Sequence, residues 1–161
     1  MIQPPERSAL LIACVLIVST LVLGGCSSVT KPKVAVESAA LGAMSDEAQV
    51  LDFAIRLDNE NREPLELDEF QYTLTINGDT VYRGRRSGQA TLSARGGKSI
   101  SIPAVIPAEA FTANGGGVTY ALSGRVWYRS PGELADILFD AGLVRPSVSF
   151  GTEGRLDLAA E

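Results

Sequence analysis

The sequence predicts an all-β domain, a sandwich of about seven short strands with one short inserted helix near the C-terminus. Two observations carry this prediction. Hydrophobic and polar residues alternate along several segments, the longest at 118–128, as in strands that bury one face. Turn-forming residues separate these segments, and Asn77-Gly78 is the strongest hairpin signal because it supplies the positive φ angles of a type I′ turn. Short strands separated by frequent turns are typical of a sandwich.

The first predicted strand opens at 34–36, and the next covers 51–58, where every second residue is hydrophobic. Asparagine and proline make 59–64 a turn. A strand over 65–76 follows. Its alternation slips between Leu67 and Phe70, which indicates a β-bulge or a bend.

The return strand of the hairpin is predicted over 80–85, with Gly84 at a bulge. A further strand around Ile100 and Ile102 should lie at an edge or end early, because Pro103 and Pro107 cannot donate backbone hydrogen bonds. The glycine-rich segment 114–117 reads as a flexible connection, and the last strand is predicted over 148–158.

The predicted helix covers 131–141. Ser130, Pro131 and Glu133 match a capping box, and Gly142 suits the C-terminal stop. The helix carries a hydrophobic stripe, which we expect to pack on the sandwich. The stripe consists of Leu134, Ile137, Leu138 and Ala141.

Three aromatic or aliphatic residues are candidates for an interaction surface. Phe139 and Leu143 lie off the helical stripe, so their exposure would let the helix dock a partner or the membrane surface. Trp127 has the opposite parity to Val126 in the longest alternation. A core position is the simpler interpretation of Trp127, whereas exposure would indicate a partner surface.

The first 25 residues are interpreted as an export signal. An apolar run from Ala9 to Leu23 is too short for a membrane span of roughly 20 residues but suits a signal peptide. The following Leu23, Gly24, Gly25 and Cys26 resemble the lipobox of bacterial lipoproteins. The alternative is an uncleaved N-terminal anchor helix.

The lipobox resemblance implies that the Cys26 thiol carries diacylglycerol and that the chain is cleaved before Cys26. Residues 26–33 would then be a lipidated tether and 34–161 the folded domain. Ser27 is not the aspartate that retains such lipoproteins at the inner membrane. We therefore expect the outer membrane, facing the periplasm.

Composition argues against several function classes. The chain has no histidine, and its two cysteines are Cys14, inside the signal, and Cys26. Histidine-based triads, most zinc sites and disulfides in the mature domain are thereby excluded. The net charge of −5 persists after cleavage, and no basic cluster indicates nucleic-acid binding.

No cofactor or metal is expected, and the carboxylates of 58–69 are interpreted as a solvated edge rather than a calcium site. A glycosidase pair of carboxylates stays open, since it requires only spatial proximity.

The order of motifs resembles the type 2 late embryogenesis abundant proteins, whose core is called the water stress and hypersensitive response domain. The resemblance spans about residues 34–158. It is carried by the turn at 59–61, the strand and turn at 70–78, Leu-Ser-Ala-Arg-Gly-Gly at 92–97, Ile-Ser-Ile-Pro at 100–103, Tyr-Ala-Leu-Ser-Gly at 120–124 and Gly-Arg-Leu-Asp-Leu at 154–158. It implies a fibronectin- or immunoglobulin-like sandwich. The family's Asn-Pro-Asn turn is Asn59-Glu60-Asn61 here, and both asparagines are expected to hold the turn locally.

Two functions follow as hypotheses. The first is a non-enzymatic, membrane-anchored envelope lipoprotein that protects in desiccation or other stress, as the resemblance implies. The alternative is an accessory module, a monomeric domain that binds another envelope protein through its sandwich edge or through the 131–141 helix.

Overall fold

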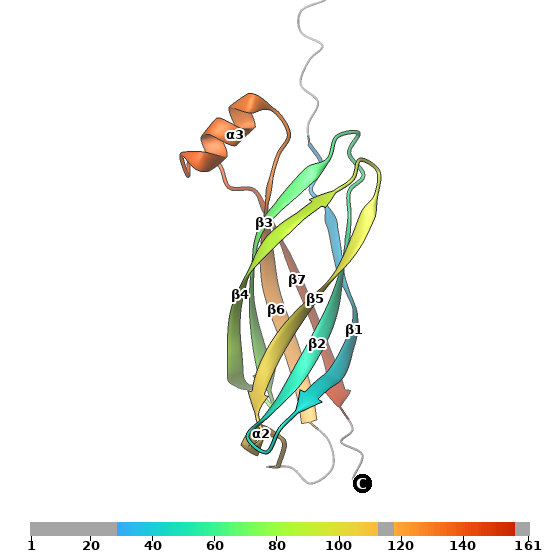
Figure 1. Ribbon diagram of the computed structural model, residues 1–161, viewed down its shortest axis with the longest axis vertical. Helices are drawn as coiled ribbons and strands as arrows, with labels where there is room; N and C mark the ends of the chain where they lie inside the picture. Colours follow the sequence, from blue (N-terminus) through green and yellow to red (C-terminus); the bar gives the residue numbers. More distant parts are fainter. Residues whose placement is uncertain (1–28, 113–117, 157–161) are drawn as a thin grey trace, which may run out of the picture.

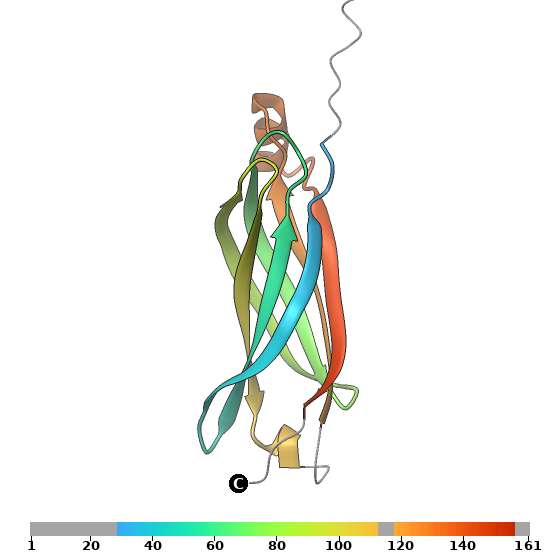
Figure 2. The same ribbon diagram turned by 90° about the vertical axis from the view of Figure 1, so that its right-hand side faces the viewer.

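The computed structural model describes residues 29–112 and 118–156 of the 161-residue chain. Within these residues, seven strands form two antiparallel sheets that pack face to face (Figures 1 and 2). One sheet has three strands in the order β1-β2-β5, and the other has four in the order β4-β3-β6-β7. The prediction of an all-β sandwich with about seven strands is confirmed.

The elements have the following bounds. The three-stranded sheet contains β1 (Lys33–Met44), β2 (Ala48–Asp58) and β5 (Gly97–Pro107). The four-stranded sheet contains β3 (Leu65–Ile76), β4 (Asp79–Leu92), β6 (Val118–Arg129) and β7 (Ser147–Leu156). Helix α2 (Glu109–Thr112) follows β5, and helix α3 (Glu133–Asp140) connects β6 to β7.

Consecutive strands run in opposite directions, so their connections alternate between the two ends of the sandwich (Figure 1). Residues 29–32, 59–64, 93–96 and 130–146 gather at what we call the upper end, where the chain enters from its N-terminal side. The β1–β2 and β3–β4 turns and α2 lie at the opposite, lower end. The start of the domain and α3 therefore share one end.

Several local predictions are confirmed. The register of β3 shifts between Leu67 and Glu69, where the alternation slips. Asn77 and Gly78 have φ values of 52° and 93°, as a type I′ turn requires. β5 is an edge strand of the three-stranded sheet and ends at Pro107.

The prediction for β4 is wrong in two respects. The strand continues to Leu92 instead of ending near residue 85, and Gly84 is not at a bulge, because it pairs in register with Tyr72. A Cβ at Gly84 would lie 2.5 Å from Cζ of Tyr72, so the glycine makes room for the tyrosine ring. The predicted connection at 114–117 lies outside the described residues, as does the end of the predicted last strand.

The core lies between the two sheets. The ring centroids of Phe53 and Tyr120 lie 5.7 Å apart across the sheets, and those of Phe70 and Phe150 lie 6.3 Å apart within the four-stranded sheet. Such aromatic pairs add to the free energy gained by burying hydrophobic surface. The most completely buried large side chains are Leu51, Phe53, Ile55, Leu57, Leu65, Phe70, Leu74, Leu92, Ile102, Ile106, Val118 and Leu122.

Tyr72 links the two sheets with a hydrogen bond. Its hydroxyl donates to the carbonyl oxygen of Pro103 at 2.6 Å. Burial raises the pKa of Tyr72 far above its ordinary value, and the neighbouring Tyr82 adds to the increase. The hydroxyl therefore stays protonated and able to donate at any physiological pH.

One row of paired residues crosses the four-stranded sheet, and two of its residues are glycines. Tyr72 pairs with Gly84 on one side and with Gly124 on the other, and Gly124 pairs with Phe150. A Cβ at Gly124 would lie 2.3 Å from Cζ of Phe150 and 2.9 Å from the carbonyl oxygen of Gln71. The two glycines accommodate the two aromatic rings.

We expect Gly124→Ala to lower the free energy of unfolding by about 1–3 kcal/mol, because the added methyl group overpacks against Phe150. Urea denaturation of the two proteins measures this difference. The matched control is Ser123→Ala at the exposed neighbouring position, which should change stability by less than about 0.5 kcal/mol. Equal unfolding midpoints for wild type and Gly124→Ala would contradict the close approach.

Candidate functional site

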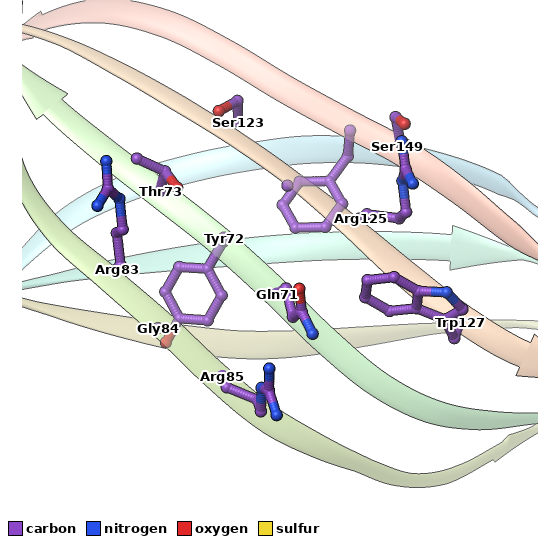
Figure 3. Close-up of a pocket in the computed structure, with 12 residues that line it drawn as sticks. Gln71, Tyr72, Thr73, Arg83, Gly84, Arg85, Ser123, Arg125, Trp127 and Ser149 are labelled. Atoms are coloured by element: carbon purple, nitrogen blue, oxygen red, sulfur yellow. The ribbon is translucent and has the colours of Figure 1, made fainter.

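A shallow groove runs across the outer face of the four-stranded sheet (Figure 3). It has a volume of about 710 Å³ and is open to solvent. Its floor is the row that contains Tyr72, Gly84, Gly124 and Phe150. Because alternate residues of a strand point to opposite faces, the residues on either side of this row direct their side chains outward.

The strand register arranges the outward side chains in two rows. One row contains Arg85, Gln71, Arg125 and Ser149, from β4, β3, β6 and β7. The other contains Arg83, Thr73 and Ser123. Trp127 lies beside the first row, one step further along β6. Three arginines and one tryptophan, together with small polar side chains, thus border the groove.

Positive charge dominates the groove, although the whole chain has a net charge of −5. Glu69 lies 3.5 Å from Arg85 and also accepts a hydrogen bond from Gln71, so it partly offsets one guanidinium. Arg125 lies over the Trp127 ring, 5.9 Å from its centroid, in a weak cation–π contact. Within the described residues, neither Arg83 nor Arg125 has a carboxylate within salt-bridge distance.

The groove has the chemistry of an anion-binding surface. Guanidinium groups bind carboxylates and phosphates through paired hydrogen bonds, and a half-exposed tryptophan offers a flat apolar surface. The described residues that line the groove carry no carboxylate, imidazole or thiol, and the Tyr72 hydroxyl is engaged with the carbonyl oxygen of Pro103. The geometry indicates an anionic ligand or an acidic segment of a partner protein.

Trp127 departs from the interpretation favoured above, because it is not a core residue. It points outward, half-buried beside the groove, while Val126 and Tyr128 on either side are buried. The alternation alone left open which parity faces the core. The three-stranded sheet covers the Val126 face, and this leaves Trp127 on the outer face.

The turn at 59–61 is organised by Asn59, which is 2% exposed. Its side-chain amide donates to the carbonyl oxygens of Glu63 at 2.8 Å and Ser93 at 3.1 Å. Its side-chain oxygen accepts hydrogen bonds from the backbone and side-chain nitrogens of Asn61, at 3.0 and 2.8 Å. Asn59 therefore bridges the β2–β3 and β4–β5 turns, a wider role than the local one that we expected.

Asn61 holds the segment that precedes β1. Its side chain accepts a hydrogen bond from the backbone nitrogen of Thr30 and donates to the backbone oxygen of Thr30, both at 2.8 Å. Lys33 donates to the carboxylate of Glu60, and this hydrogen bond, with the charge of Glu60, raises the pKa of Lys33. The beginning of the domain is thus attached to the β2–β3 turn.

Helix α3 differs from its prediction. It begins at Glu133 after Gly132, whose φ is 111°, and no side chain caps its first turn, so the capping box is absent. Its C-terminal stop is confirmed. Gly142, with φ 70°, donates to the carbonyl oxygen of Phe139, and Leu143 donates to that of Leu138, as in a Schellman motif.

The two faces of α3 are reversed relative to the prediction. Phe139 is buried, with the guanidinium carbons of Arg129 and Arg145 lying 4.4 and 5.0 Å from its ring centroid. Arg129 pairs with Asp140 at 2.8 Å, and this hydrogen bond raises the pKa of Arg129. Arg145 pairs with Asp68 of β3 at 3.0 Å. Phe139 and these ion pairs, not the predicted stripe, attach α3 to the sandwich.

Most of the predicted stripe is exposed instead, and of its four residues only Leu138 is half-buried. Leu134 and Ile137 are 70% and 64% exposed, and Leu143 is 73% exposed. Leu143 is therefore on the surface, as an interaction site requires, whereas Phe139 is unavailable for docking. Helical spacing identified the apolar face but could not show which face meets the sandwich.

Other predictions fall outside the described residues. These include the lipidation site Cys26 and the lipobox residues Leu23, Gly24 and Gly25. Within the described residues, no helix is long and apolar enough to cross a membrane, and no group of three potential metal ligands occurs. The three groove arginines were missed, because their common feature, an outward position on neighbouring strands, depends on the register of pairing.

Comparison with known proteins places these features in context. A family model described as late embryogenesis abundant protein matches residues 54–149. No curated protein matches the chain. The chain is similar to the solution structure of a protein from Arabidopsis thaliana, with a TM-score of 0.64 and 14% identity over 84% of this chain and 87% of that one.

Two further solved structures are similar. One is a candidate late embryogenesis abundant (LEA) protein, with a TM-score of 0.62 and 12% identity over 95% of this chain and 86% of that one. The other is a protein from Archaeoglobus fulgidus, with a TM-score of 0.54 and 14% identity over 83% of this chain and 100% of that one. At these identities, the structural similarities show a shared fold alone.

The asparagine turn yields a testable contrast. We expect Asn59→Ala to cost about 2–3 kcal/mol of stability, because it removes several hydrogen bonds of a buried side chain at once, including the buried one to the carbonyl oxygen of Leu92. Asn61→Ala should cost about 1 kcal/mol, since its lost bonds to Thr30 are exposed and water replaces them. Urea unfolding checks both values, and a larger loss for Asn61→Ala than for Asn59→Ala would be inconsistent with the assigned roles.

Proposed function

This chain belongs to the late embryogenesis abundant protein family, and from that membership we propose that it is a non-enzymatic protein that protects in desiccation or other stress. We further propose that it belongs to the cell envelope and is anchored there by lipid on Cys26. We place it at the outer membrane, facing the periplasm. The signal at 1–25 and the lipobox support the anchor.

The single observation that carries the anchored arrangement is the attachment of Thr30 to Asn61. Four residue steps separate Cys26 from Thr30, so their Cα atoms are at most about 14 Å apart. A lipid on Cys26 would therefore hold the upper end of the sandwich close to the membrane surface. The groove, on the side of the sandwich, would stay accessible from the periplasm.

Protection without chemistry agrees with the residues present. The chain contains no histidine, and the groove residues serve hydrogen bonding and charge pairing. A sandwich stabilised by packing and hydrogen bonds, without a disulfide in its mature part, does not depend on the redox state of its surroundings. Its polar outer face can replace water around membranes or partly unfolded proteins as water is lost.

The test combines anchoring with protection. The purified wild-type chain should carry the mass of a diacylated or triacylated Cys26 without residues 1–25, whereas Cys26→Ala should keep the signal and lack lipid. Bound to vesicles, the wild-type chain should preserve a drying-labile enzyme better than an equal mass of albumin. Protection no better than that of albumin would contradict the stress role. A wild-type chain whose mass shows no lipid would contradict the anchor.

The groove favours a second candidate function, an accessory module that binds an acidic segment of another envelope protein. Arg83 and Arg125 lack carboxylate partners within the described residues and stand at outward positions on either side of β3, diagonally across the groove. Burial of such cations against carboxylates gives specificity and fast association. This candidate differs from the first in requiring one defined partner.

A photo-crosslinking residue at Ser123, within the groove, should capture one reproducible envelope protein, and the same residue at exposed Glu37 of β1 should not. The double variant Arg83→Glu/Arg125→Glu should abolish the product, because it reverses the charge of the groove. Identical products from both crosslinking positions, or products that persist after charge reversal, would exclude the groove as the binding site.

A further inference from the structure

An exposed apolar patch covers the outer side of α3 and the residues after it. It consists of Leu134, Ile137, Leu143 and Val144, all at least half exposed. Single exposed hydrophobic residues are ordinary, but four within eleven residues, two on one face of α3 and two directly after it, make this segment a candidate docking surface. The patch lies at the upper end of the sandwich, where the chain enters the domain (Figure 1).

The patch is held in place rather than loosely attached. Phe139, on the opposite side of α3, packs between Arg129 and Arg145. Backbone hydrogen bonds from Leu143 and Val144 to the carbonyl oxygen of Leu138, at 2.9 and 3.1 Å, fix the residues that follow the helix. The packing of Phe139 therefore turns the apolar stripe of α3 outward.

The short distance along the chain from Cys26 to the start of the domain indicates what the patch binds. Three residue steps separate Cys26 from Val29, so their Cα atoms are at most about 11 Å apart. The bonds between Asn61 and Thr30 keep this short tether at the upper end. A lipid on Cys26 would bring the bilayer to the same end that presents the patch.

Positive and negative side chains at the upper end balance, so the charge of this end neither attracts it to a bilayer nor repels it. Lys31, Arg62 and Arg95 are exposed cations there, suited to lipid phosphates. The carboxylates of Glu63, Glu133 and Asp136 offset them. Association should then depend on burial of the patch and only weakly on salt or anionic lipid.

We propose that the exposed patch of α3 docks on the lipid bilayer to which Cys26 is anchored, so that the domain is held in one orientation with its upper end on the membrane. This inference rests on the lipid anchor of the proposed function. The lipid supplies attachment, and the patch supplies orientation. The sides of the sandwich, including the groove, then face the periplasm.

The experiment uses the full lipidated chain in phosphatidylethanolamine–phosphatidylcholine vesicles. Because lipid consumes the Cys26 thiol, Ala141→Cys introduces one reactive thiol beside the patch for an environment-sensitive dye. Asp79→Cys, at the start of β4 beside the turn at the lower end, is the matched position. The twelve residues of β1 span about 40 Å, so the lower position should lie beyond reach of the bilayer.

Headgroup-region nitroxide lipids should quench the dye at residue 141 several-fold more than the dye at residue 79. The variant Leu134→Ser/Ile137→Ser should remove this difference while Cys26 keeps its lipid mass. Met44→Ser/Val105→Ser, which removes exposed apolar residues elsewhere, should leave it unchanged. All four substituted positions are exposed, so folding, checked by circular dichroism, should persist.

Equal quenching at both positions in a chain with lipidated Cys26 would overturn the docking and leave the anchor intact. Energy transfer between two copies labelled at residue 141, lost in Leu134→Ser/Ile137→Ser, would assign the patch to a second copy and also overturn the docking. A Cys26 without lipid would overturn both the anchor and the docking. If the quenching disappeared at high salt, charge attraction and not apolar insertion would hold the domain on the membrane, and this would contradict the proposal.

Discussion

The arrangement of the upper end depends on the buried side chain of Asn59. The β2–β3 and β4–β5 turns both cross from one sheet to the other, and Asn59 donates hydrogen bonds into the second of them while shaping the first. Backbone bonds from Asn59 to Gly96 and from Arg95 to Asn61 complete the contact between the turns. Because a buried amide without partners is costly, this network joins both crossovers and, through Asn61, the tether in one unit.

The groove follows from the alternation of side chains along the strands of the four-stranded sheet. Tyr72 and Phe150 point into the core, where the absence of side chains at Gly84 and Gly124 makes room for their rings. On the outer face, the backbone of this row lies between two rows of outward side chains, which include Arg83, Arg85 and Arg125. The same strands thus supply the core on one face and the candidate binding site on the other.

The start of the domain and α3 lie at one end of the sandwich, and the groove lies along its side. Under the lipid anchor that we propose, this separation would let the domain meet the bilayer and a periplasmic ligand at the same time. The ion pairs of Arg129 and Arg145 contribute modestly as surface interactions, yet they enclose Phe139 and so select the face that α3 presents. A small number of polar contacts decides the orientation of a hydrophobic surface.

The sequence by itself determined the sandwich, the Asn77-Gly78 hairpin, the bulge near Leu67, the edge position of β5 and the stop of α3 at Gly142, because period-two alternation and turn chemistry are local properties. Only the tertiary structure decided which face of an amphipathic segment is covered. It turned Trp127 outward and buried Phe139 in place of the predicted stripe. It also assembled the groove, since strand register brings residues together that lie up to 79 positions apart in the sequence, as Gln71 and Phe150 do. Periodicity shows that a face is apolar, but the neighbouring elements that cover it are set by long-range packing.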